Sequence, residues 1–163
     1  AQIIHPKDFQ QFGRLQVIPS IQTTHATSDM YWADERLGKE RLKGAYAYQK
    51  LLQQNGWLPN GSDFPVEQIN PLFGFYAAVA RRDQEGWPEQ GFQTKNKLSR
   101  EQALRAMTIW AAKASFAENS RGSLQKGKVA DFVILDKDLM KAPQDELFNI
   151  DVLQTWIAGK RVY

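Results

Sequence analysis

A single carboxylate stands where an α/β protein would place a working acid. The run Gly61-Ser62-Asp63-Phe64-Pro65-Val66-Glu67 follows a short apolar segment, and its Gly-Ser pair predicts a tight turn at the end of a strand. Catalytic groups of (β/α) proteins gather at the carboxyl ends of their strands. A carboxylate held there can bind a metal ion or accept a proton from water. Asp63 is therefore a candidate for both roles, the alternative being that it only caps the following turn through the backbone amides of residues 64–67.

Other candidates lie in the segment that precedes this turn and in the turn itself. His25 would lie at the same edge of the protein as Asp63, where an imidazole can contact a substrate. A lone loop histidine is, however, often only a hydrogen-bonded or exposed residue. Asp29 and Trp32 follow in a loop, and such loops set the specificity of (β/α) proteins. We therefore take His25, Asp29 and Trp32 as substrate-binding candidates, while ordinary loop polarity explains Asp29 equally well. Glu67 is expected to close the Asp63 loop through backbone hydrogen bonds.

The elements that must position these residues are predicted to form one βαβ unit. Residues 15–23 are rich in β-branched side chains and predict a buried strand, with Pro19 at a bulge or strand end. Residues 35–54 have apolar side chains near helical spacing and predict one long helix, which Asn55-Gly56 ends. Residues 57–61 predict the second strand. Because parallel strands joined by a crossover present their carboxyl ends at one edge, His25 and Asp63 are expected to lie together.

The rest of the chain predicts two more helices and then short strands. An apolar helix is expected over 71–82, and Ser99 with Gln102 forms a capping box that starts a helix running to about residue 118. Strands are expected over 131–136 and 152–158, followed by a hairpin turn at Gly159-Lys160.

The composition limits the classes of partner. The chain has 163 residues, of which 42% are hydrophobic and 24% charged, as in an ordinary globular domain. Its net charge of +3 comes from basic residues interspersed with acids, so no nucleic acid is expected as a partner. No apolar run approaches the roughly 18 residues of a membrane span, so no membrane partner is expected either. Two histidines and no cysteine cannot build a three-ligand imidazole or thiolate site, and the compartment stays open.

Several motifs together resemble the amidohydrolase superfamily of metal-dependent hydrolases, in particular the branch that includes N-substituted formamide deformylases. They span nearly the whole chain in the order of the family, and the third and last are the most specific: Thr24 to Met30, Gly44 to Ala47, Gly61 to Glu67, Asn70 to Leu72, Leu98 to Leu104, and Gly122 to Asp131.

The resemblance implies an α/β fold that is only part of a larger one. It would be the C-terminal part of a TIM (β/α)8 barrel over residues 1–120, followed over 121–163 by strands of a small β-sandwich. Asp63 would touch the metal and take a proton from the attacking water. The cofactor would be a divalent metal, zinc by resemblance, held mostly by residues outside this chain, and the start of the sequence reads as the inside of a longer chain.

Three hypotheses compete at this point. In the first, the chain is part of an amidohydrolase that cleaves a C–N bond of a small amide-type or N-formyl substrate, and the chain alone is inactive. In the second, it is a non-catalytic fragment that acts as an assembly or binding module. Either way, an open part of a barrel exposes apolar faces and strand edges, so the partner would be the N-terminal remainder of the barrel or a second copy. A third, an independent metal site at His25, Asp29 and Asp63, is weaker because it lacks strong transition-metal ligands.

Overall fold

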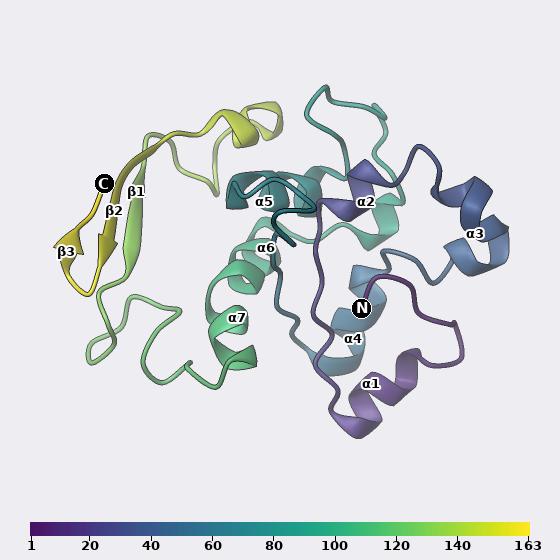
Figure 1. Ribbon diagram of the computed structural model, residues 1–163, viewed down its shortest axis with the longest axis horizontal. Coiled ribbons are helices and arrows are strands. Elements are labelled where there is room, and N and C mark those ends of the chain that lie inside the picture. Colours follow the sequence, from purple (N-terminus) through teal and green to yellow (C-terminus); the bar gives the residue numbers. More distant parts are fainter.

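The computed structural model describes residues 1–163 and has a body of helices with a small sheet at one side (Figure 1). The seven helices are α1 (Phe9–Leu15), α2 (His25–Ser28), α3 (Ala33–Leu42), α4 (Tyr48–Asn55), α5 (Pro71–Ala80), α6 (Arg100–Met107) and α7 (Ile109–Ala114). The strands are β1 (Phe132–Leu135), β2 (Val152–Ile157) and β3 (Lys160–Arg161), and short 3-10 helices cover Thr94–Asn96 and Gln144–Asn149. No helix combines the length and the apolar character that crossing a membrane requires.

The two predicted parallel strands are reduced to a single bridge. Ile21 pairs in parallel with Asn60; the Ile21 amide donates to the Pro59 carbonyl and the Gly61 amide donates to the Ile21 carbonyl, both at 2.9 Å. Pro19 and Pro59 have no amide hydrogen to donate, which limits extension of the pair. The predicted strands at 15–23 and 57–61 are therefore too long, but their parallel direction is confirmed.

The prediction of one long helix over residues 35–54 is wrong. The chain forms α3 and α4 instead, with a turn at 43–47 where the N-terminal segment crosses it. The Ile4 amide donates to the Gly44 carbonyl at 2.9 Å, and the Tyr46 amide donates to the Gln2 carbonyl at 2.8 Å. These long-range bonds replace helical ones. Gly56 ends α4 in the left-handed conformation, with φ of 74°, as the Asn55-Gly56 pair predicted.

Two predicted helix starts are confirmed and one helix end is wrong. Pro71 opens α5, and the Asn70 side chain accepts a hydrogen bond from the Leu72 amide. The capping box of α6 is complete, with Ser99 and Gln102 bonded in both directions. The predicted continuation to residue 118 is broken at Thr108, whose hydroxyl donates to the Leu104 carbonyl at 2.6 Å. Helix α7 then ends at Ala114, and Phe116, which lies within the predicted helix, is exposed.

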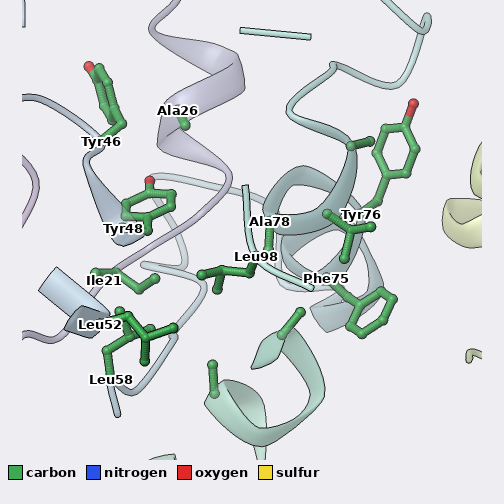
Figure 2. Packing of buried hydrophobic residues seen from close by; sticks show 14 of the residues in the cluster. Ile21, Ala26, Tyr46, Tyr48, Leu52, Leu58, Phe75, Tyr76, Ala78 and Leu98 are labelled. Carbon is green, nitrogen blue, oxygen red and sulfur yellow. The ribbon is translucent and has the colours of Figure 1, made fainter. Parts of the chain in front are cut away.

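The hydrophobic core lies where α4, α5 and α6 meet the segments that carry the parallel bridge (Figure 2). Most of its large, fully buried apolar side chains lie in or next to these elements: Ile21, Tyr48, Leu51, Leu58, Phe75, Tyr76 and Leu98. Helix α5 is buried along nearly its whole length, which explains why the sequence shows it as an apolar run without a polar face. The candidate site therefore rests on the best-packed part of the molecule.

The C-terminal strands form a three-stranded antiparallel sheet in the order β1-β2-β3. Phe132 stacks on its cross-strand partner Trp156, with ring centroids 5.5 Å apart. The hairpin is confirmed, but its two loop residues are Ala158 and Gly159, both with positive φ, one position earlier than predicted. Asp131 accepts a hydrogen bond from the Ala158 amide and so fixes this turn.

Candidate active site

His25 and Asp63 meet at the edge where both were expected. His25 starts α2 four residues after Ile21, and Asp63 follows Asn60 by three residues. Because Ile21 and Asn60 pair in parallel, both chain segments leave the bridge in the same direction. His25 Nε2 lies 2.9 Å from Asp63 Oδ2, which confirms the predicted juxtaposition.

The carboxylate of Asp63 is not used in capping its own turn. The Asp63 carbonyl, not its side chain, accepts from the amides of Val66 and Glu67 at 2.8 and 3.3 Å, and the Phe64 amide donates to the Ser62 hydroxyl. The turn-capping interpretation is therefore wrong. Asp63 has φ of 62°, a left-handed conformation that aspartate tolerates better than most residues. The turn leaves the side chain 50% exposed and directed at His25.

The ring of His25 is enclosed by carboxylates on both sides. Glu67 Oε1 lies 3.3 Å from His25 Nδ1, and Asp29 Oδ2 lies 3.9 Å from the same nitrogen. The predicted backbone bond of Glu67 to the Asp63 loop is present, but its side-chain contact with His25 was not predicted. The spacing of four residues between Asp63 and Glu67 was the only sequence signal for it.

Asp29 is turned toward the interior. Its Oδ2 accepts hydrogen bonds from the Tyr46 hydroxyl and from Gln2 Nε2, both at 2.8 Å, and the residue is buried. Trp32, by contrast, is 46% exposed at the start of α3. The structure thus places Asp29 in a buried network beside His25 and Trp32 on the surface, and a substrate contact of either residue stays a prediction.

A buried arginine that the sequence did not single out supports this network. Arg81 Nη1 donates to the Tyr46 carbonyl at 3.3 Å, and Nε donates to the Phe92 carbonyl at 2.9 Å. Its guanidinium lies 4.9 Å from the centre of the Tyr48 ring. Burial lowers the pKa of Arg81 below its usual value. Arg81 therefore holds the turn that carries Tyr46, the partner of Asp29.

Alkaline pH is expected to unfold this region. Burial first, and the hydrogen bond to Asp29 second, raise the pKa of Tyr46 above its usual value, and burial does the same for Tyr48. Both phenols stabilise the fold below the unfolded pKa of about 10, and this stability is lost as pH rises through the higher folded pKa. We expect the free energy of unfolding to fall above pH ~10, measured by denaturant titration. Tyr46→Phe should make this decrease in the free energy of unfolding smaller, whereas Tyr163→Phe, at an exposed position, should not change it.

A cavity of about 260 Å³ lies beside Glu67, the carboxylate that is near His25 Nδ1. Its wall contains Ser28, Glu67, Tyr31, Tyr76 and Arg82. Tyr31 stacks on Trp87 and donates to Asp83; this hydrogen bond raises the pKa of Tyr31 to about 12. Neither Asp29 nor Trp32 contributes to the wall.

Comparison with known proteins decides the family. The profile of the amidohydrolase family matches residues 1–163, the whole chain. This chain belongs to the amidohydrolase family. The family resemblance predicted from the motifs is therefore confirmed.

The chain matches only part of the length of each relative. The chain is 37% identical over 164 residues to Protein LONG AFTER FAR-RED 3 of Arabidopsis thaliana, covering all of this chain and 28% of that protein. It is 30% identical over 128 residues to the N-substituted formamide deformylase of Arthrobacter pascens, covering 78% of this chain and 22% of that enzyme. The chain thus spans less than a third of these relatives.

Parts of two solved structures have the same fold as this chain. A metal-dependent hydrolase of Pyrococcus horikoshii superposes with a TM-score of 0.76 at 28% identity, over 88% of this chain and 29% of that one. The Escherichia coli guanine deaminase shares the fold at 20% identity and a TM-score of 0.62, over 98% of this chain and 37% of the deaminase. The α/β fold of this chain is therefore that of amidohydrolases.

The residues of this chain fit only part of a metal site. No group of three or more His, Cys, Asp or Glu side chains is arranged to hold a metal ion, which also weighs against an independent site at His25, Asp29 and Asp63. Both ring nitrogens of His25 face carboxylates. Asp63 has a half-exposed carboxylate with one oxygen at His25, so it suits a single ligand position.

Proposed function

We propose that this chain is the C-terminal part of a metal-dependent amidohydrolase that hydrolyses a C–N bond in a small amide-type or N-formyl substrate. The observation that carries the proposal is the contact of 2.9 Å between His25 Nε2 and Asp63 Oδ2 at the end of the parallel bridge. Family membership and similarity to a protein named as a formamide deformylase support the bond type.

In this proposal Asp63 and His25 move the proton of the attacking water. The Asp63 carboxylate accepts the proton as the water attacks the carbonyl carbon. His25 Nε2, at hydrogen-bond distance and unprotonated at that stage, can hold this proton until the leaving nitrogen takes it. The same two groups can then return a proton to the leaving nitrogen, which departs more readily as a neutral amine.

Asp63 would also supply the one metal contact of this chain. A divalent metal, which we propose to be zinc, would polarise the carbonyl and make water a stronger nucleophile near neutral pH. The other ligands would come from outside residues 1–163, since the donor set here is incomplete. We propose residues 1–120 as the end of a (β/α)8 barrel and 121–163 as strands of a sandwich.

The proposed partner is the N-terminal remainder of the barrel. Support comes from apolar side chains that have no cover on the small sheet: Val133, Ile134, Leu153 and Ile157 are each more than 40% exposed. Exposed apolar surface of this kind is typical of an interface. The same observation favours the second candidate, a non-catalytic module that associates with itself through this sheet. We expect no membrane or nucleic-acid partner.

Reconstitution separates the two candidates. The chain would be produced alone and together with an N-terminal part, supplied in trans from the P. horikoshii relative or from the native gene. The readouts are mass in solution and release of formate or amine from N-formyl and simple amide substrates. We expect turnover only in the combined protein, lost with a chelator and restored by Zn²⁺. A combined, metal-loaded protein without turnover would contradict the enzyme proposal, and a stable oligomer of the chain alone would favour the module.

A further inference from the structure

Two buried hydroxyl groups in the cavity beside Glu67 have no hydrogen-bond partner in the chain. Thr24 Oγ1 and the Tyr76 hydroxyl both belong to residues of the cavity wall, and these residues are only 8% and 2% exposed. A buried hydroxyl without a partner is destabilising. In a cavity wall, however, such a group can bond to a molecule that enters the cavity.

The surrounding structure holds both hydroxyls in place. Tyr76 lies on α5, and its ring meets that of Phe148 edge to face, with centroids 5.0 Å apart. Thr24 directly precedes α2, and the hydroxyl of the residue before it, Thr23, donates to the Gly74 carbonyl of α5 at 2.6 Å. The two hydroxyls thus come from segments that are bonded to each other, so the cavity is preformed.

The charged groups of the wall favour an uncharged ligand. Arg82 is the only basic residue of the wall, and it is already paired, with Nη2 donating to the Glu89 carbonyl and Nη1 lying 3.5 Å from Asp145. Acidic residues of the wall, of which Asp83 is one, repel an anion. An ammonium group has no acceptor for the hydrogen of the Tyr76 phenol. A neutral hydroxyl or carbonyl oxygen avoids both conflicts.

The cavity adjoins the proposed reaction centre. Thr24 directly precedes His25 in the chain, and Glu67 is both part of the wall and 3.3 Å from His25 Nδ1. The volume of about 260 Å³ is smaller than the roughly 300–1,000 Å³ of typical small-molecule sites. The cavity therefore has room for one end of a substrate whose reacting carbonyl lies at Asp63.

We propose that this cavity is a specificity pocket that binds an uncharged, hydroxyl- or carbonyl-bearing end of the substrate through Tyr76 and Thr24. Its role in turnover rests on the proposed function, whereas binding to the cavity does not. A hydrocarbon end of the same size would leave both hydroxyls unpaired, and sites built to hydrogen-bond a substrate discriminate strongly against such analogues.

Binding of four formamides to the metal-free combined protein tests the pocket without turnover. N-(2-hydroxyethyl)formamide carries the expected hydroxyl, whereas N-propylformamide, N-formylglycine and N-(2-aminoethyl)formamide carry a methyl group, a carboxylate and an ammonium group. With ¹³C-labelled tyrosine, the Tyr76 signal is the one that is lost in Tyr76→Phe. We expect the hydroxyethyl compound to shift this signal saturably and to bind about 5-fold more tightly than the other three.

Variants that each remove one hydroxyl identify the groups that bind. Tyr76→Phe and Thr24→Val should each weaken binding of N-(2-hydroxyethyl)formamide about 3- to 10-fold and leave that of N-propylformamide unchanged. The thermal midpoint should stay equal or rise, because a hydroxyl without a partner adds no stability. Tyr163→Phe removes an exposed phenol outside the cavity; it is the matched control and should change neither quantity.

Selectivity of turnover is the second readout. In the metal-loaded protein, kcat/KM for N-(2-hydroxyethyl)formamide should exceed that for N-propylformamide, and Tyr76→Phe should reduce the ratio about 3- to 10-fold. Selective binding in a protein without turnover would support the pocket and contradict the proposed function. Equal binding of the four compounds or an unmoved Tyr76 signal would overturn the pocket. A lower thermal midpoint of Tyr76→Phe with no loss of binding would also overturn it, by showing that the phenol bonds to the N-terminal part.

Discussion

Asp63→Asn is expected to remove nearly all turnover of the combined protein. The amide keeps the size of the side chain but cannot accept the proton of the attacking water or pass it to His25 Nε2, 2.9 Å away. Loss of a positioned general base typically costs about 10²- to 10⁴-fold in rate, so kcat should fall by about 1,000-fold. Steady-state kinetics with the best amide or formyl substrate measures this.

Stability should hardly change in the same variant. The side chain is half exposed, and an ion pair of that kind is worth about 1 kcal/mol or less. Asp138→Asn is the matched control and should retain full activity: it lies at a surface turn, where its carboxylate accepts the Met140 amide and forms an exposed ion pair with Lys141. If Asp63→Asn unfolded the protein, or if its kcat matched that of the control, Asp63 would not be the working acid.

Gly44→Ala is expected to have the largest effect on stability. A Cβ atom at Gly44 would lie 1.8 Å from the Ile4 carbonyl oxygen, a backbone atom that cannot rotate away. The N-terminal segment would have to leave the turn, losing the Ile4 to Gly44 hydrogen bond and loosening Gln2 and Tyr46, the partners of Asp29. Forced overpacking of this kind costs about 3 kcal/mol, and thermal unfolding should shift down by roughly 10 °C.

Substitutions at two other glycines distinguish the steric clash at Gly44 from the cost of a strained backbone conformation. Gly61→Ala meets no atom within 4 Å and needs no positive φ, so it should change the free energy of unfolding by less than about 0.5 kcal/mol. Gly56→Ala also has open space but a φ of 74°, and strain alone should cost about 1 kcal/mol. A loss at Gly44 no larger than that at Gly56 would refute the close approach of Ile4.

Local signals in the sequence determined much of the fold around the site. The capping box at Ser99, the opening of α5 at Pro71 and the end of α4 at Gly56 are each set by one or two neighbouring residues. The hairpin before β3 follows from its glycine in the same way. The parallel direction of the segments at Ile21 and Asn60 followed from the crossover between them, and it was enough to bring His25 and Asp63 to one edge.

Features that depend on residues distant in sequence could not be predicted in this way. Helical spacing over 35–54 did not predict the break at Gly44. The break is made by backbone hydrogen bonds between Gly44 and Ile4 and between Tyr46 and Gln2, which are distant in the sequence. The same holds for Asp29, whose polar type suggested a loop surface but whose partners Gln2 and Tyr46 lie inside the molecule.

The type and order of residues thus determined by themselves the family, the candidate acid and its histidine. Only the tertiary structure decided that Glu67 reaches His25 Nδ1, that Asp63 points away from its own turn, and that Asp29 is buried. The physical reason is that spacing encodes local backbone geometry, whereas the partner of a polar side chain depends on which segments the core brings into contact.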